Sequence, residues 1–75
     1  MNKIISNSKA ILDNIFEGYP VKATRTDGQE YIISMERVNG DEFFKYQVEG
    51  FVYVFNSFDD MIKKLSNHDF LSIEF

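Results

Sequence analysis

The chain has no cysteine, and it has only one histidine, His68, and one proline, Pro20. Without cysteine there is no disulfide framework and no thiolate metal site. A single histidine also excludes the usual zinc sites, which combine several histidine ligands. We therefore expect neither a metal nor a cofactor.

Long hydrophobic runs are missing as well. The opening residues, MNKIISNSKA, hold two adjacent apolar residues, too few for the apolar region of a signal peptide. No run approaches the roughly 18 apolar residues that a membrane-spanning helix needs. These absences predict a soluble, cytoplasmic protein.

Basic charge is scarce. The eight Lys and Arg residues are scattered and face twelve Asp and Glu residues, which gives a net charge of −4. Nonspecific binding to nucleic acid needs clustered Lys or Arg at the phosphates, so direct nucleic-acid binding is not expected. The many Ile, Asn, Lys and Phe residues are those that AT-rich codons specify, which indicates a low-GC bacterium or its phage.

The 75 residues predict a single domain, 1–75, with a small core. An apolar stripe predicts a helix from about residue 4 to 17, capped by Ser6 or Ser8 and ended by Gly18. Turn signals at 27–28, 39–40 and 49–50 then separate runs rich in strand-forming residues. The expected strands span about 21–26, 30–38, 42–48 and 51–56, in meander order.

Two turns, at Asn39-Gly40 and Glu49-Gly50, define the strand register independently. They agree on which residues share one side of the sheet, whereas a slip of one residue would scatter that set over both faces. Val21 and Ala23 join this side if the first loop has three residues. The shared set is Tyr31, Ile33, Met35, Phe44, Tyr46, Val48, Phe51, Tyr53 and Phe55.

The remaining residues predict one more helix and one more strand. The stretch 57-SFDDMIKKLSN-67 has the pattern of a capped helix, with Ser57 at its start and two aspartates in its first turn. The tail 71-LSIEF-75 alternates apolar and polar residues, as a strand does. We therefore predict an α+β fold, α-β-β-β-β-α-β, with an antiparallel sheet and both helices on one face.

The stretch 43-FFKYQVEGFVYVF-55 holds six aromatic residues. Part of it, 50-GFVYVF-55, is similar to the RNP1 signature of the RNA-recognition motif, although Glu49 stands where a basic residue is expected. Stacking on bases needs exposed aromatics, and the predicted register puts Phe51 and Tyr53 beneath the helices. We therefore interpret most of the cluster as hydrophobic core.

The second face of the predicted sheet has no helix left to cover it. Its cross-strand rows are Ile32–Gln47–Val52, Ser34–Lys45–Val54 and Glu36–Phe43–Asn56. Four apolar side chains in these rows, Ile32, Phe43, Val52 and Val54, are expected to form a contiguous patch rimmed by Glu36, Lys45 and Gln47, and such a patch on a surface is typical of an interaction site. The alternative is that the N-terminal segment or the tail partly covers it.

No arrangement of residues indicates catalysis. His68 has Asp69 beside it in sequence, Asp59 and Asp60 are explained by helix capping, and no glycine-rich run forms a phosphate cradle. We therefore predict that the protein is not an enzyme and has no catalytic residues.

The acidic side chains suggest one function. Small acidic proteins can imitate the charge of DNA and block proteins that bind it, through steering toward a basic groove. Candidate carboxylates are Asp13, Glu17, Asp27, Glu30, Glu36, Asp41, Glu42, Glu49, Asp59 and Asp60. The alternative is an ordinary solvated surface.

The hairpin 27-DGQEYIIS-34 resembles a segment of the small phage-encoded anti-CRISPR proteins that inhibit type II-A Cas9, one of which carries a similar DGxEYxIS hairpin. The chain departs from that pattern after Met35, where hairpins continue in place of a helix. The resemblance implies that carboxylates would occlude the DNA-binding groove of the target.

The leading hypothesis is a non-enzymatic, phage-borne or mobile-element module that binds a protein such as a nuclease and occludes its nucleic-acid site. The alternatives are a nucleic-acid-binding module that uses the sheet, and a homodimer formed sheet on sheet. The predicted partner-binding residues are Ile32, Glu36, Asp41, Glu42, Phe43, Lys45, Val52 and Val54.

Overall fold

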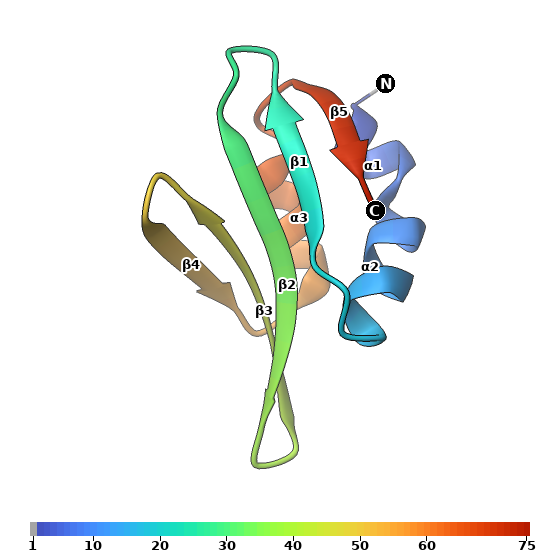
Figure 1. Cartoon of the computed structure of the whole chain (residues 1–75). Coiled ribbons are helices and arrows are strands. Elements are labelled where there is room, and N and C mark those ends of the chain that lie inside the picture. Colours follow the sequence, from blue (N-terminus) through green and yellow to red (C-terminus); the bar gives the residue numbers. More distant parts are fainter. Residues whose placement is uncertain (1) are drawn as a thin grey trace.

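The computed structural model describes residues 2–75 and confirms the α+β fold and its element order. A five-stranded antiparallel sheet has the order β4-β3-β2-β1-β5 (Figure 1). The strands are β1 (Val21–Arg25), β2 (Glu30–Val38), β3 (Asp41–Val48), β4 (Phe51–Phe55) and β5 (Phe70–Glu74). The helices are α1 (Lys3–Ser6), α2 (Ser8–Phe16) and α3 (Phe58–Leu65). None of the helices within residues 2–75 has the length and apolar character needed to cross a membrane.

The register predicted from the two turns is confirmed. In the β2–β3 hairpin Val38 pairs with Asp41 and Met35 pairs with Phe44. In the β3–β4 hairpin the pairs are Val48–Phe51, Tyr46–Tyr53 and Phe44–Phe55. The expected pair Tyr31–Val48 lies one step beyond the β2–β3 ladder, which ends at Ile32–Gln47.

The turn residues adopt the backbone that two-residue hairpin loops need. Asn39 and Gly40 have φ of 52° and 85°, and Glu49 and Gly50 have φ of 52° and 81°. Positive φ at both central residues gives the turn a twist that matches the flanking strands. The β1–β2 loop has three residues, 26–28, which Arg25 N–H closes by donating to Gln29 O at 2.8 Å, so Val21 and Ala23 join the shared side as the condition required.

The N-terminal helix is not continuous, so the prediction of one helix over residues 4–17 is wrong. Asn7 interrupts it with φ −109° and ψ 11°, and its side-chain Nδ2 donates to Lys3 O at 2.8 Å. Short polar side chains compete with helical hydrogen bonds in this way. Neither serine caps a helix: Asn2 caps α1, where its Oδ1 accepts from Ile4 N–H at 2.8 Å.

The ends of the longer helices follow the prediction. At the end of α2, Gly18 has φ +90° and Tyr19 N–H donates back to Asn14 O at 3.0 Å, which is a Schellman ending. At the start of α3, Ser57 Oγ accepts from Asp60 N–H at 3.3 Å. The capping pattern in the sequence was therefore sufficient to place both boundaries.

The core lies between the sheet and the three helices, which all pack on one side (Figure 1). Strand alternation sends Val21, Ala23 and Ile33 from the sheet into this layer, and all three are fully buried. The final strand, β5, pairs antiparallel with β1, so it forms one edge of the sheet and β4 forms the other. The other buried apolar residues are Ile4, Ile11, Ile15, Tyr31, Phe44, Tyr46, Met61, Leu65 and Phe70.

Candidate functional site

The side of the sheet opposite the helices, called here the open face, is the first candidate site. The predicted rows are present in the ladder: Ile32 pairs with Gln47 and Gln47 with Val52, while Ser34 pairs with Lys45 and Lys45 with Val54. Glu36 pairs with Phe43, but β4 ends at Phe55, so Asn56 lies outside the third row.

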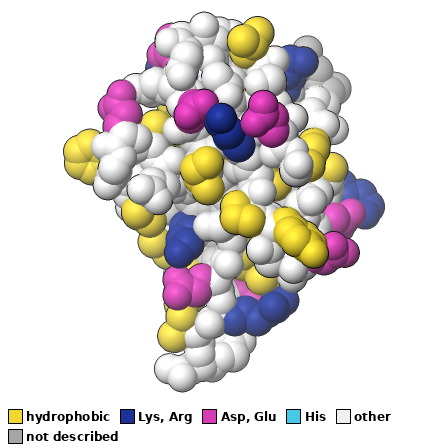
Figure 2. Space-filling view, viewed as in Figure 1, with side chains coloured by type: hydrophobic (Ala, Val, Ile, Leu, Met, Phe, Trp, Pro, Cys, Tyr) yellow, Lys and Arg dark blue, Asp and Glu magenta, His cyan; other side chains and the backbone are white. Residues whose placement is uncertain are grey.

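The exposed apolar residues predicted for the open-face site divide into two groups. Val52 and Val54 are neighbours on β4 and are 53% and 58% exposed. Ile32, which is 40% exposed, lies two strands away, with Gln47 between it and Val52. The structure therefore brings the two valines together but does not join Ile32 to them, and Figure 2 shows hydrophobic side chains on this face separated by charged and other groups.

The other predicted site residues lie around these groups. Phe43 and Lys45 are half-buried on the open face, and Glu36 and Asp41 are exposed. Alternation along β3 puts Glu42 on the helix side, with Phe44. There Glu42 Oε2 lies 3.3 Å from Nε of Arg37, so it belongs to a different surface from Glu36 and Asp41.

Ion pairs cross the open face between neighbouring strands. Nζ of Lys45 lies 3.4 Å from Oε2 of Glu36, and Nζ of Lys22 lies 2.7 Å from Oε2 of Glu30 and 3.9 Å from Oε2 of Glu74. The hydrogen bond with Glu30, reinforced by its charge, raises the pKa of Lys22. The face therefore presents both signs of charge in pairs, and exposed pairs of this kind contribute little to stability.

The prediction that Phe51 and Tyr53 lie beneath the helices is wrong. Their register is as predicted, but Phe51 is 62% exposed and Tyr53 is 45% exposed. The cause is the position of α3, an eight-residue helix that covers the Phe55 end of the strand and leaves the turn end free. As a result every residue of β4 except half-buried Phe55 is exposed.

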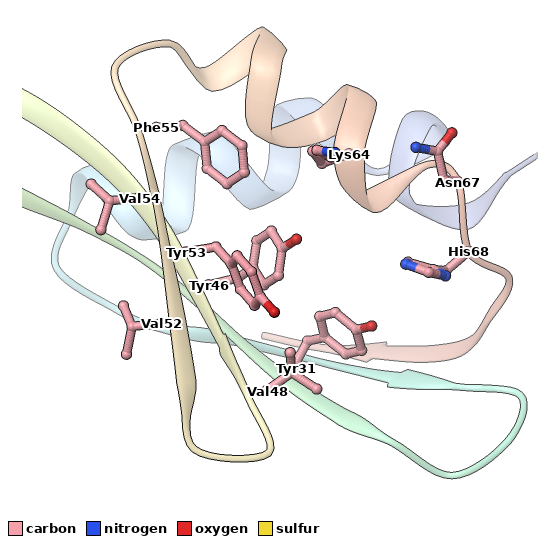
Figure 3. Close-up of a pocket in the computed structure, with 10 residues that line it drawn as sticks. All are labelled: Tyr31, Tyr46, Val48, Val52, Tyr53, Val54, Phe55, Lys64, Asn67 and His68. Atoms are coloured by element: carbon pink, nitrogen blue, oxygen red, sulfur yellow. The ribbon is translucent and has the colours of Figure 1, made fainter.

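This exposure opens a groove of about 540 Å³ on the helix side, which the sequence did not reveal (Figure 3). Tyr46 forms its floor, with ring centroids 5.0 Å from Tyr53 and 5.5 Å from Tyr31. Lys64 and His68 line its far side, while Val52 and Val54 of β4 point away toward the open face. Burial, with the neighbouring tyrosines, raises the pKa of Tyr46.

His68 lies in the turn that follows α3. Its ring is half-buried and lies 6.1 Å from the ring of Tyr31. Tyr31 in turn accepts a hydrogen bond from Nη1 of Arg25 at 2.9 Å. Among residues 2–75 no three His, Cys, Asp or Glu side chains gather as a metal site would require.

Comparison of the chain with protein-family models, with curated proteins and with solved structures finds no match. The resemblance to anti-CRISPR inhibitors therefore stays a prediction. Any function must be inferred from the open face, the groove and the exposed strand β4.

Proposed function

We propose that this protein is a non-enzymatic module that binds another protein through the open face of its sheet. The observation that carries the proposal is the exposure of Ile32, Val52 and Val54 on a sheet face that no helix of residues 2–75 covers. Protein interfaces combine exposed apolar contacts with polar and charged side chains at their rim, and this face offers both kinds of group.

The ion pairs on this face favour a partner that carries both signs of charge. Lys45 and Glu36 neutralise each other locally, as do Lys22 and Glu30. Binding would therefore depend mainly on apolar contact, with the charged pairs setting orientation rather than affinity. We expect the affinity for the partner to change only modestly with salt.

The test compares two substitutions of exposed apolar residues by aspartate. Ile32→Asp places a charge on the open face, away from the edge of the sheet. Tyr19→Asp is the matched control, because Tyr19 is also a large, exposed hydrophobic residue but lies in the α2–β1 connection. The partner is first captured from a bacterial lysate with the tagged wild-type protein, and its binding to each purified variant is then titrated.

We expect Ile32→Asp to weaken binding at least tenfold, which corresponds to about 1.4 kcal/mol. Tyr19→Asp should bind as the wild type does, and both variants should retain the wild-type circular dichroism spectrum. Equal affinity of the wild type and a folded Ile32→Asp variant would contradict the proposal.

A narrower form of the proposal is that the partner is a nucleic-acid-binding protein, such as a nuclease, whose groove the module occludes. Asp41 supports this form, because it is exposed on the open face and has no ion-pair partner among residues 2–75. Asp41→Asn should then slow association with the captured partner, most strongly at low salt, since steering acts on the association rate. Capture that survives nuclease treatment but shows no dependence on Asp41 would leave the broader proposal and reject this form.

The exposure of Phe51 and Tyr53 favours a second candidate function, the binding of single-stranded nucleic acid. Exposed aromatic rings provide stacking platforms for bases, and Lys64 lies across the groove from Tyr53. This function predicts that oligonucleotides quench tyrosine fluorescence at low salt and that Phe51→Ala reduces the quenching. No quenching at low salt would reject it.

A further inference from the structure

The two edges of the sheet are protected to different extents. The β5 edge has a register irregularity opposite Thr24 and Arg25, carries the charge of Glu74, and is packed against α1. Bulges, charges and covering elements are the usual means by which proteins prevent an edge strand from pairing with another chain. The β4 edge has none of them: its five residues, FVYVF, include no charge and no proline, and no helix lies beyond it in Figure 1.

The backbone of β4 presents hydrogen-bonding groups to this free edge. In a two-residue hairpin the residues that flank the turn, here Val48 and Phe51, form a hydrogen-bonded pair, and pairs then alternate along the ladder. Tyr53 and Phe55 therefore bond to β3 as well. The N–H and C=O groups of the intervening residues, Val52 and Val54, point outward and have no partner in the ladder.

The sequence of β4 reads the same in both directions around Tyr53: Phe, Val, Tyr, Val, Phe. An antiparallel strand with the same sequence would meet it with identical chemistry at every position. We propose that β4 pairs with β4 of a second copy of this chain, with the two-fold axis at Tyr53, to form one continuous sheet across a homodimer.

This register satisfies the free backbone groups. Val52 of each copy lies opposite Val54 of the other and forms a hydrogen-bonded pair with it. Tyr53 lies opposite Tyr53 of the second copy in a non-hydrogen-bonded pair, in which side chains approach more closely. Because β4 carries no charge, two chains of net charge −4 can meet along it without placing like charges opposite each other.

The dimer would change both candidate surfaces. On the open face, Val52 and Val54 of the two copies would form one contiguous patch of four valines, which a single copy does not have. On the helix side, the stacked Tyr46 and Tyr53 rings of the two copies would form one row of aromatic side chains. The inference stands on the strand edge and does not depend on the proposed partner binding.

The test uses two double variants that differ at one position. Val52→Lys with Val54→Glu places opposite charges in each intermolecular pair, whereas Val52→Glu with Val54→Glu places like charges there. Both variants share the change Val54→Glu opposite Lys45 within the chain, so their effects on the β3–β4 hairpin match at that position. Molar mass is measured by sedimentation over a range of micromolar concentrations, and folding is checked by circular dichroism.

We expect the wild type and the opposite-charge variant to reach twice the 8.8 kDa of the chain as concentration rises, and the like-charge variant to stay at 8.8 kDa. A wild type that stays at 8.8 kDa at every concentration overturns the proposal, as does a like-charge variant that still dimerises. A monomeric opposite-charge variant beside a dimeric wild type overturns the register around Tyr53.

A third variant keeps the test valid if a charged variant fails to fold. Val54→Pro removes an outward N–H without removing a hydrogen bond to β3, a position where a sheet edge tolerates proline. It should be folded and monomeric. Ile32→Asp separates the two proposals, because Ile32 lies on β2, two strands from the free edge. This variant should lose the open-face partner and still dimerise.

Discussion

Asn2 connects the start of the chain to the end of α3. Its replacement by alanine should therefore lower the free energy of unfolding more than an ordinary surface substitution does. Its Oδ1 caps α1 by accepting from Ile4 N–H at 2.8 Å. Its Nδ2 donates to two carbonyl oxygens, that of Ser66 at 3.0 Å and that of His68 at 2.9 Å. These two contacts join residues 64 and 66 positions apart, so they hold the N-terminal helix against the last turn before β5.

The magnitude follows from these three hydrogen bonds. Loss of an N-cap costs about 1 kcal/mol. The two contacts are only partly buried, so water can replace Nδ2 as the donor, and their bonds together add about another 1 kcal/mol. We therefore expect Asn2→Ala to lower the free energy of unfolding by about 2 kcal/mol, which corresponds to a fall of roughly 8 to 16 °C in Tm for a domain of this size.

The assay is urea unfolding followed by circular dichroism, at one fixed protein concentration because dimer formation would make stability depend on concentration. Asn2→Ser is the control variant, since serine can cap α1 but cannot reach both carbonyls. It should lose about half as much stability as Asn2→Ala. A free energy of unfolding for Asn2→Ala within about 0.5 kcal/mol of the wild-type value would contradict this prediction, because a change that small is typical of an ordinary surface substitution.

Two further predictions concern the core and pH. Met61 is fully buried, so Met61→Ala should lower the free energy of unfolding by about 2 to 5 kcal/mol in the same urea assay; a loss below about 1 kcal/mol would mean that α3 is not packed as described. The hydrogen bond from Arg25 lowers the pKa of Asp27 below its ordinary value of 3.8. A lowered pKa contributes stability above the unfolded-state pKa, and this is lost as the pH falls through the folded-state pKa. The stability difference between the wild type and Asp27→Asn should therefore be present at neutral pH and vanish well below pH 3.8; a difference that persists there would contradict the assignment.

Local chemistry explains which parts of the fold were predictable. Asn39-Gly40 and Glu49-Gly50 determine their hairpins through backbone φ alone, and once the turns are placed, alternation assigns every strand residue to a face. The open-face rows around Val52 and Val54 follow directly from that register. The prediction that the apolar residues in these rows form one contiguous patch was wrong, because Gln47 lies between Ile32 and Val52 in the same row.

The errors have one local cause and two tertiary ones. The helix break at Asn7 depends on a side-chain hydrogen bond, which competes with the apolar stripe that predicted one continuous helix. The exposure of Phe51 and Tyr53 depends on how far α3 extends along β4. The register assigns each side chain to one side of the sheet, but it does not show whether a helix covers that side chain. The free edge of β4 likewise became visible only when β5 was found beside β1.

Amide hydrogen exchange of single residues tests most directly the claim that β4 is an interaction edge. The amides of Tyr53 and Phe55 point toward β3 and serve as internal controls, which should be protected at every protein concentration. The amides of Val52 and Val54 point outward. We predict that their exchange slows as the concentration is raised, because the second copy supplies their hydrogen-bond acceptors. Fast exchange of Val52 and Val54 at every concentration, with Tyr53 and Phe55 protected, would contradict the claim.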